Sequence, residues 1–392
     1  MLISLHSTLR SRGAALVAAL LLAACGGGGE INGTSSRSGT LNVSLTDAPA
    51  CGFDAVNVTV QRVRVHPSET AEDTASGWID IRLNPARKIN LLNLRNGVRD
   101  TLGQTSIPEG RYNQIRLVLQ SGSVLANSVV PSGGRETALD TPSALQSGIK
   151  LIHNFTVLAG QTVDLVLDFD ACRSIVTANA GRYLLKPVVR ALTTANGATI
   201  SGSVPTALTV AGATLSLQTL DSNGRPVVVT ATTPDAGSGT FQFAPVPAGG
   251  NYTLVAAAPG YSTVVVRNVP TSAGGTTAVG TLQQPPVSVM SQISGRIFPV
   301  GNDAAARAIQ FLTGGPAIEV AYANAQFSTG QYALSVPINP PLVTTYTASG
   351  LPLFVGDTLV AGLYTLQAST PTQNAEVDIS VGTQDVIQDF TF

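Results

Sequence analysis

The sequence is poor in charge and in the residues that most enzymes use. Only 11% of its 392 residues are charged, and the formal net charge is −1. A chain without a basic excess has no field to attract nucleic acid, so no nucleic-acid partner is expected. The sequence has three histidines but no H-E-x-x-H, Cys/His cluster, G-x-S-x-G, Walker loop or dinucleotide glycine motif. These absences predict a protein that is not an enzyme and has no cofactor.

Long apolar runs are also scarce, apart from one near the N-terminus. Arg10 and Arg12 precede Gly13–Ala24, an apolar stretch that would make about 18 Å of helix, too short for a ~30 Å bilayer core. A positive start, a short apolar run and small residues before Cys25 are typical of a secretory signal peptide over residues 1–24. We therefore expect an exported protein.

The stretch Leu22–Cys25 resembles a bacterial lipobox, whose cysteine becomes the first residue of the mature protein and receives the lipid. The resemblance implies a lipoprotein anchored to the lipid bilayer through acylated Cys25, with palmitate among its chains and residues 25–38 as a Gly/Ser tether. Because Gly26 rather than Asp follows the cysteine, the outer membrane of the bacterial cell envelope is the favoured location. An ordinary secreted protein with a chance cysteine is the alternative.

Cysteine itself is rare, with three in the chain. With Cys25 assigned to the lipid, Cys51 and Cys172 remain, and two thiols exported to an oxidising compartment predict a disulfide. Closing so long a loop would restrict the unfolded chain by about 4–5 kcal/mol in the entropy model. Two free thiols are the alternative.

Beyond the signal no long helical stripe appears, and alternating apolar residues predict strands. Leu41, Val43 and Leu45 share one face of a strand over Gly39–Asp47. In the next strand the apolar residues move from even to odd positions near Gln61, which requires a bulge or a change of sheet. Further strands are expected at Gly77–Leu83, Tyr112–Gln120, Leu151–Leu158, Thr162–Phe169 and Tyr183–Leu192, and a short helix, or a strand and a turn, at Lys88–Leu102.

The abundance of glycine (39) and proline (23) between Val- and Thr-rich segments indicates an all-β fold of tandem antiparallel β-sandwiches. Three units are expected, over residues 39–192, 197–283 and 291–392, each enclosing its own core. The second and third open with the same Ile-Ser-Gly, which indicates a diverged repeat. A linker stiffened by Pro285-Pro286 separates them.

One local pattern, Gly-x-Tyr, recurs in all three units. Glycine permits a turn, and the tyrosine then begins a strand with its ring in the core and its hydroxyl bonded back to the turn, as in the tyrosine corners of sandwich domains. A ligand-stacking role for the rings is the alternative. The five tyrosines are Tyr112, Tyr183, Tyr252, Tyr332 and Tyr364.

Several motifs of the first unit occur together. They are GTLNVSLTDAPACGFDAVNVTVQRVRVH (Gly39–His66), Gly77-Trp78, SIPEGRYNQIRLVL (Ser106–Leu119), LVLDFDACRSIV (Leu165–Val176) and YLLKPVVR (Tyr183–Arg190). On these motifs the segment from Gly39 to about Leu192 resembles domain-of-unknown-function family 4382 of bacterial lipoproteins. The resemblance implies a β-sandwich located in the envelope and implies no activity.

The second unit carries ISGSV, TTPDAGSGTFQF, VPAGGNYTL and AAPGY. This pattern is similar to the carboxypeptidase regulatory-like modules, which implies an immunoglobulin/transthyretin-like sandwich without chemistry of its own. The modules share their fold with starch-binding domains, so fold analogy suggests carbohydrate or protein contact. The third unit keeps ISG, GQYAL and AGLYTL but lacks the A-x-G-Y step.

Three aspartates are the best candidates for a metal site, although no metal is assigned. Asp164, Asp168 and Asp170 are spaced to share a strand face, and carboxylate oxygens in such an array could bind Ca²⁺. A solvated strand face opposite apolar residues is the favoured interpretation, because the spacing is not that of a known calcium loop.

Arg62, Arg64 and His66 share a face of another strand. They would bind an anionic ligand or pair with the aspartates across the sheet, and cross-strand pairing is favoured. The sequence identifies no catalytic residue, and the ligand-binding residues stay unknown.

These observations predict a non-catalytic, lipid-anchored cell-envelope protein with a structural or binding role. Its expected partners are the lipid bilayer and either envelope polysaccharide or another envelope protein. A carbohydrate-binding protein of the outer membrane is the alternative, and an enzyme or a calcium-binding protein is the third hypothesis.

Overall fold

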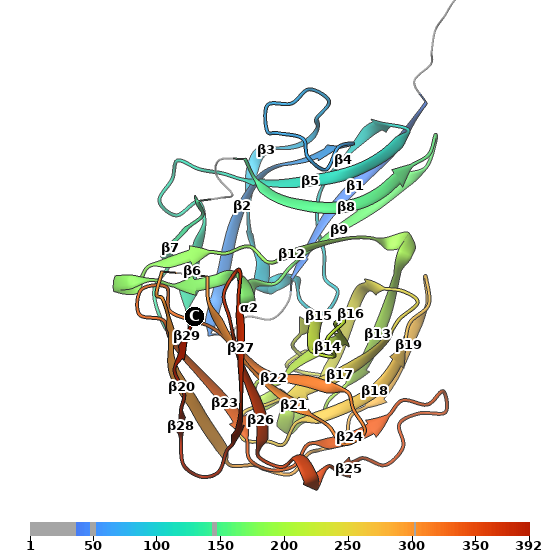
Figure 1. Cartoon of the computed structure of the whole chain (residues 1–392). Helices are drawn as coiled ribbons and strands as arrows, with labels where there is room; N and C mark the ends of the chain where they lie inside the picture. Colours follow the sequence, from blue (N-terminus) through green and yellow to red (C-terminus); the bar gives the residue numbers. More distant parts are fainter. Residues whose placement is uncertain (1–36, 48–51, 143–146, 302) are drawn as a thin grey trace, which may run out of the picture. The chain divides into compact units, whose positions relative to one another are not determined.

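The computed structural model describes residues 37–47, 52–142, 147–301 and 303–392, and residues 37–392 form one compact unit. Nearly every element is a strand (Figure 1), so the all-β prediction is confirmed. No helix among the described residues is long and apolar enough to cross a membrane. We refer to residues 37–193, 197–281 and 290–392 as the first, second and third modules.

The first module consists of two packed sheets that enclose one core. The smaller sheet has the order β12-β9-β1-β4, formed by Val189–Thr193, Thr162–Phe169, Ser38–Asp47 and Asp100–Pro108. The larger has the order β10-β11-β7-β6-β2-β5-β8, with β3 also paired to β2. Its strands are β2 (Phe53–His66), β3 (Ile79–Asn90), β5 (Gly110–Leu119), β6 (Ser128–Pro131), β7 (Thr137–Asp140), β8 (Ile149–Val157), β10 (Ile175–Thr177) and β11 (Tyr183–Leu185).

The helix considered for Lys88–Leu102 does not form. Strand β3 continues to Asn90, where the chain makes the short 3-10 turn η1 (Leu91–Leu94). The Asn90 side chain accepts a hydrogen bond from the backbone N–H of Leu92 (3.2 Å) and so caps the turn. Three leucines of this turn enter the core, so burial of a compact apolar cluster outweighs the helical spacing. The other alternative, a strand followed by a turn, is the observed structure.

The second module also has two sheets. One is β16-β13-β19, formed by Thr240–Pro247, Gly197–Ser203 and Thr276–Thr281. The other contains β15-β14-β17-β18, formed by Pro226–Thr232, Thr214–Leu220, Asn251–Ala257 and Val264–Pro270. Short helical segments are η3 (Thr194–Asn196) before this module and α3 (Thr206–Val210) within it; α2 (Ala171–Ser174) and η2 (Asn179–Gly181) belong to the first.

The third module repeats the two-sheet plan. Strand β20 pairs with β23, β28 and β29, which are Met290–Phe298, Gln331–Pro337, Val386–Ile387 and Phe390–Thr391. The facing sheet has the order β22-β21-β26-β27, which are Ala317–Asn324, Ala305–Phe311, Leu363–Ser369 and Asn374–Ser380. A 3-10 turn, η4 (Thr358–Val360), precedes β26.

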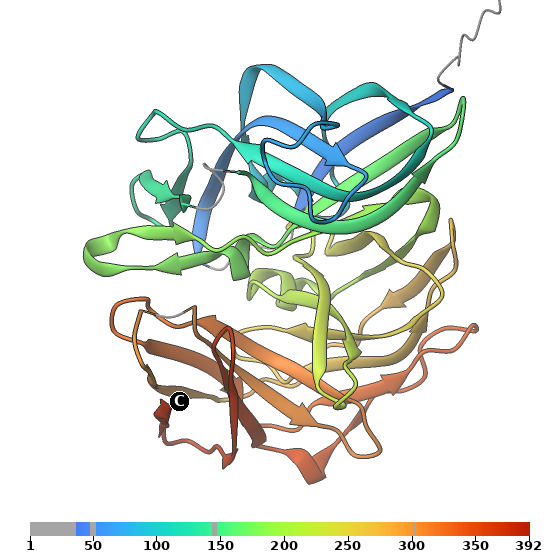
Figure 2. The same cartoon turned by 45° about the horizontal axis from the view of Figure 1, so that its top comes forward.

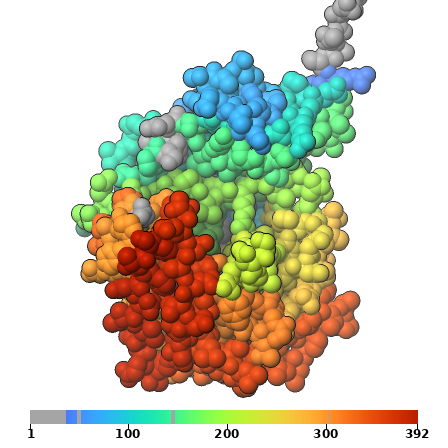
Figure 3. All heavy atoms as spheres, in the orientation of Figure 1, coloured from blue at the N-terminus to red at the C-terminus, as the bar shows by residue number. Residues whose placement is uncertain are grey.

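The second and third modules share a sheet. Strand β24 (Leu342–Thr345) of the third module pairs in parallel with β18 of the second, and β25 (Val355–Gly356) pairs with β24. The core of the second module accordingly contains Leu342 and Phe354. The third module thus completes the core of the second, while the remaining apolar side chains of the third form a cluster of their own. The two modules lie against each other in the space-filling view (Figure 3, yellow and orange to red).

Pairing within the sheets is mostly antiparallel, as predicted, with a bulge and parallel closures. The register of β2 shifts between Val60 and Arg62 against both neighbours, so the bulge predicted near Gln61 is confirmed. The pairs β1–β9, β13–β19 and β20–β28 are parallel. Each module thus pairs its first strand with one that comes later in the chain. Figure 2 shows how the sheets of the three modules are stacked.

The five tyrosines of the Gly-x-Tyr pattern differ in what their hydroxyls bond. Tyr112 and Tyr252 donate to the carbonyls of Pro108 (3.0 Å) and Pro247 (2.7 Å), just before their own strands, so the predicted turn bond is confirmed for these two. Tyr364 donates instead to the carbonyl of Pro337 (2.7 Å), 27 residues earlier, and Tyr332 donates to that of Gln388. Tyr183 packs edge-on against Phe53 (5.6 Å between centroids).

Candidate functional site at the junction of the modules

A short helix of the first module presents an arginine to the other two. Asp170 caps α2 by accepting a hydrogen bond from the backbone N–H of Arg173 (3.0 Å). The same carboxylate lies 3.5 Å from the Arg173 guanidinium, which also stacks over the ring of Tyr322 at 4.1 Å. The cap therefore fixes both the start of the turn and the direction of its arginine.

Glu319, on β22, joins side chains from several strands. Its carboxylate binds Arg173 of the first module and lies 3.4 Å from Arg307 of β21. The side chain of Glu319 is only 5% exposed. A carboxylate so far out of water is tolerated because two guanidinium groups balance its charge.

Gln218 supplies the contact from the second module. Its Nε2 donates to the Glu319 carbonyl and its Oε1 accepts from the Glu319 N–H, both at 2.8 Å. A buried side-chain amide thus satisfies the peptide groups at the edge of β22. We call Arg173, Glu319, Arg307, Gln218 and Tyr322 the junction cluster.

Asn324 ties the end of β22 to the first module. Its Nδ2 donates to the carbonyls of Arg173 (3.0 Å) and Ile175 (3.1 Å), and its Oδ1 accepts from the hydroxyl of Tyr322 (2.7 Å). The backbone N–H of Phe327 also bonds the carbonyl of Thr177 (3.0 Å). The first and third modules are therefore joined by a continuous set of hydrogen bonds.

Burial shifts the pKa values of the groups around the cluster. Burial raises the pKa of Tyr322 to about 12, partly opposed by Arg173. Burial also raises the pKa of Asp170, against the opposite effect of Arg173. Burial alone would lower the pKa of Arg173, but Glu319 and Asp170 outweigh it and the net shift is upward. Arg173 thus stays a cation and Tyr322 a neutral phenol across the physiological range.

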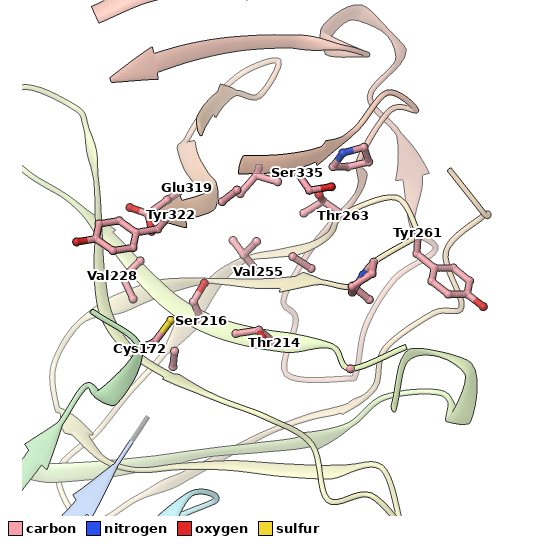
Figure 4. A pocket seen from close by; sticks show the side chains of 18 of the residues that line it. Cys172, Thr214, Ser216, Val228, Val255, Tyr261, Thr263, Glu319, Tyr322 and Ser335 are labelled. Carbon is pink, nitrogen blue, oxygen red and sulfur yellow. The ribbon is translucent and has the colours of Figure 1, made fainter. Parts of the chain in front are cut away.

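A pocket of about 310 Å³ opens beside the cluster. Figure 4 shows Glu319 and Tyr322 toward one end and Tyr261 toward the other. Its apolar wall includes Val255 and Ala257 of β17, while Thr214 and Ser216 of β14 add hydroxyls. We call this the junction pocket.

Strand alternation explains the lining of the junction pocket. Leu215 and Leu217 of β14 enter the core of the second module, so Thr214 and Ser216 point to the opposite face of the sheet. That face is covered by the third module, and Val255 and Val265 pack there against Leu312 and Ile318. The pocket is the part of this contact that small side chains leave unfilled.

The charged groups of the junction cluster are paired with one another. Arg173 is paired with Asp170 and Glu319, and Arg307 with Glu319. Within residues 37–47, 52–142, 147–301 and 303–392, no group of three or more His, Cys, Asp or Glu side chains could hold a metal ion.

The three aspartates considered for calcium have separate environments. Asp164 is exposed and accepts a hydrogen bond from the Nδ2 of Asn42 (2.8 Å). Asp168 is partly buried beside Thr230 of the second module, and burial, with a smaller effect of Asp170, raises its pKa to about 7. The favoured interpretation, a solvated strand face, is therefore wrong for Asp168 and Asp170. The second and third modules cover this end of the strand, and Asp170 caps α2.

The basic face of β2 pairs within its own sheet. Arg64 binds Asp80 of β3 (2.8 Å), and Arg62 lies 3.3 Å from the same carboxylate. Cross-strand pairing is confirmed, but the partner is Asp80, because β9 belongs to the other sheet. His66 instead accepts from the N–H of Ser68 through Nδ1 (2.9 Å).

The cysteines can be placed only in part. Cys25 and Cys51 lie outside the described residues, so lipidation and the Cys51–Cys172 pairing stay predictions. Cys172 lies on α2, at the wall of the junction pocket. A disulfide there would fix the turn that carries Arg173.

The junction cluster was not found from the sequence. Glu319 is the only charge in the apolar segment Ala317–Asn324, and Gln218 directly follows the buried Leu217 in an otherwise alternating strand. These are the signals that could have indicated buried polar partners. Neither signal predicts which residue, 100 or more positions away, will contact Glu319 or Gln218.

Residues 38–187, nearly the whole first module, match the family model described as "Domain of unknown function (DUF4382)". The match leaves the second and third modules unassigned, and their likeness to carboxypeptidase regulatory-like modules stays a prediction. No curated protein matches the chain.

Solved structures give distant matches. The major pilin subunit BcpA of Bacillus cereus is 10% identical, with 91% of this chain and 99% of that chain covered and a TM-score of 0.16. A putative adhesin from Bacteroides ovatus is 10% identical, with 68% and 95% covered and a TM-score of 0.17. The C-terminal fragment of pilus adhesin SpaC from Lactobacillus rhamnosus GG is 14% identical, with 63% and 98% covered and a TM-score of 0.14. TM-scores this low carry no functional argument.

Proposed function

We propose that this chain is a non-catalytic, lipid-anchored protein of the bacterial cell envelope with a structural or binding role. The observation that carries the non-catalytic part is the junction cluster, whose buried charges pair with one another and join the modules. A general acid or base needs a titratable group free to reach a substrate. The lipobox-like Leu22–Cys25 supports the anchor.

Anchoring is tested with Cys25→Ser in the full chain. Labelled palmitate should enter the unmodified protein and a Gly28→Ala control, but not Cys25→Ser, because only the cysteine thiol can receive the lipid. Membrane fractionation should show the same loss. Palmitate still entering Cys25→Ser would contradict the proposal.

The outer membrane is tested by separating the two membranes on a density gradient. The unmodified protein should sediment with the outer membrane, and Gly26→Asp should move it to the inner membrane, since an Asp after the lipidated cysteine favours retention there. An unmodified protein found in the inner membrane would contradict this location.

The predicted disulfide is tested on the exported protein. Mass spectrometry after alkylation without reductant should find Cys51 and Cys172 linked in one peptide pair. A Cys51 that is alkylated quantitatively without reductant would refute the pairing.

Carbohydrate binding is a second candidate, favoured by the hydroxyls at the junction pocket. Thr214, Ser216, Ser335 and Tyr261 all contribute to its lining. A glycan array with residues 37–392, which contain the whole compact unit, tests this function. Binding to envelope polysaccharides would support it, and an array without any signal would remove it.

A further inference from the structure

The junction pocket lies where ligand sites are commonly found. All three modules contribute to its wall, through Cys172 and Arg173, Ser216 and Val255, and Val320 and Ser335 respectively. Pockets for small molecules occur preferentially at domain interfaces and begin at volumes of about 300 Å³. The pocket is therefore large enough for a small ligand and is held by contacts from every part of the compact unit.

The charges at the pocket are already balanced. The guanidinium of Arg173 binds Glu319 and lies 3.5 Å from Asp170. A charged ligand would have to leave water without gaining an unpaired counter-charge among the described residues of the pocket. An uncharged ligand avoids that desolvation cost.

The side chains that line the pocket between its charged end and Tyr261 are small and mainly apolar. Val255, Ala257 and Val320 give them their apolar character. Thr263 adds an unused polar group, because it is 1% exposed and its hydroxyl has no hydrogen-bond partner among the described residues. Such a pocket suits an apolar molecule that carries one or two hydrogen-bonding groups.

We propose that the junction pocket binds an uncharged, mainly apolar small molecule. The site deepens the binding part of the proposed function and does not depend on the lipid anchor. Its ligand would touch all three modules at once, so binding would stabilise their association.

The probe is N-phenyl-1-naphthylamine, a neutral apolar fluorophore with one N–H donor. Residues 37–392 contain every described strand and all four hydrophobic clusters, so this segment is titrated, without detergent. One saturable site is expected. Ala257→Leu should weaken binding at least tenfold by filling the pocket, whereas Ala278→Leu, the same change on exposed β19, should leave it within twofold.

Two further arms keep the test decisive. Ser335→Leu fills the pocket from the third module and replaces Ala257→Leu if that variant does not fold. The anionic analogue 8-anilino-1-naphthalenesulfonate should bind at least tenfold more weakly than the neutral probe. Unsaturable binding, equal affinity in the leucine variants, or equal affinity for the anion would overturn the proposal, while palmitate labelling decides the anchor separately.

Discussion

The second and third modules are joined by apolar burial, whereas the first is joined to them by polar side chains. Strand β24 extends the sheet of the second module and brings Leu342 and Phe354 into its core. By contrast, no hydrophobic cluster of the described residues contains side chains of both the first module and another. Arg173, Glu319 and Asn324 form the connection there instead.

The two kinds of interface differ in what can change them. Apolar burial does not depend on the titration of any group and scales with the area removed from water. A buried ion pair contributes little over an apolar pair, but removing one partner is costly because the other charge stays buried. The polar junction therefore contributes more to the specific arrangement in which the first module is attached than to the free energy of the attachment.

The largest effect is expected from the shared core. Phe354→Ala should lower the free energy of unfolding of residues 37–392 by about 3–5 kcal/mol, because a buried phenyl ring leaves a cavity. Leu353→Ala, one residue away and 80% exposed, is the control and should change it by less than about 0.5 kcal/mol. Urea titration measures both, and equal effects would show that β24 and its loop do not complete the second module.

The junction cluster should give the next effect. Glu319→Gln leaves Arg173 and Arg307 without their carboxylate and should cost about 2–4 kcal/mol. Glu376→Gln makes the same change in the more exposed pair with Arg225 and should cost no more than about 1 kcal/mol. Urea unfolding compares the two variants. A Glu319→Gln protein as stable as Glu376→Gln would mean that the junction cluster does not hold the first module.

The comparison also shows where sequence reasoning ends. Strand alternation placed Leu41, Val43 and Leu45 in the core. The move of the apolar residues from even to odd positions near Gln61 located the bulge of β2. Both follow from the period of two, which is local. Each of the last two units was expected to enclose its own core, but the core of the second also takes Leu342 and Phe354 from the third. The continuous run Val264-Val265-Val266 contained that signal, because a strand apolar on every residue is buried on both faces.

The candidate site was less predictable than the fold. Asp168 and Asp170 alternate as an exposed strand would, and only the covering modules make them buried. The pairs of Glu319 with Arg173 and Gln218 span 146 and 101 residues. No local pattern specifies such distant meetings, so they had to come from the structure.

The first module's attachment should depend on pH through Asp168. Its pKa is raised from 3.8 to about 7, so the carboxyl favours folding below pH 4 and this contribution is lost as pH rises through 7. Stability should fall by on the order of 1–3 kcal/mol between pH 5 and pH 8. Asp168→Asn should flatten that slope in thermal melts, whereas Asp164→Asn, on the exposed part of β9, should keep it. An unchanged slope in Asp168→Asn would assign the dependence elsewhere.

The smallest effect concerns the turn from which the chain crosses to the second module. The hydroxyl of Tyr364 donates to the carbonyl of Pro337 (2.7 Å), the last residue of β23 before the chain continues to β24. Tyr364→Phe should cost about 1–2 kcal/mol, because it leaves a buried carbonyl without its donor while the ring still fills the core. Tyr183→Phe is the matched control, since the partly buried Tyr183 ring contacts Phe53 and its hydroxyl makes no hydrogen bond to the described residues; about 0.5 kcal/mol or less is expected. If urea unfolding gives equal losses, the bond from Tyr364 to Pro337 is not what holds the crossing segment in place.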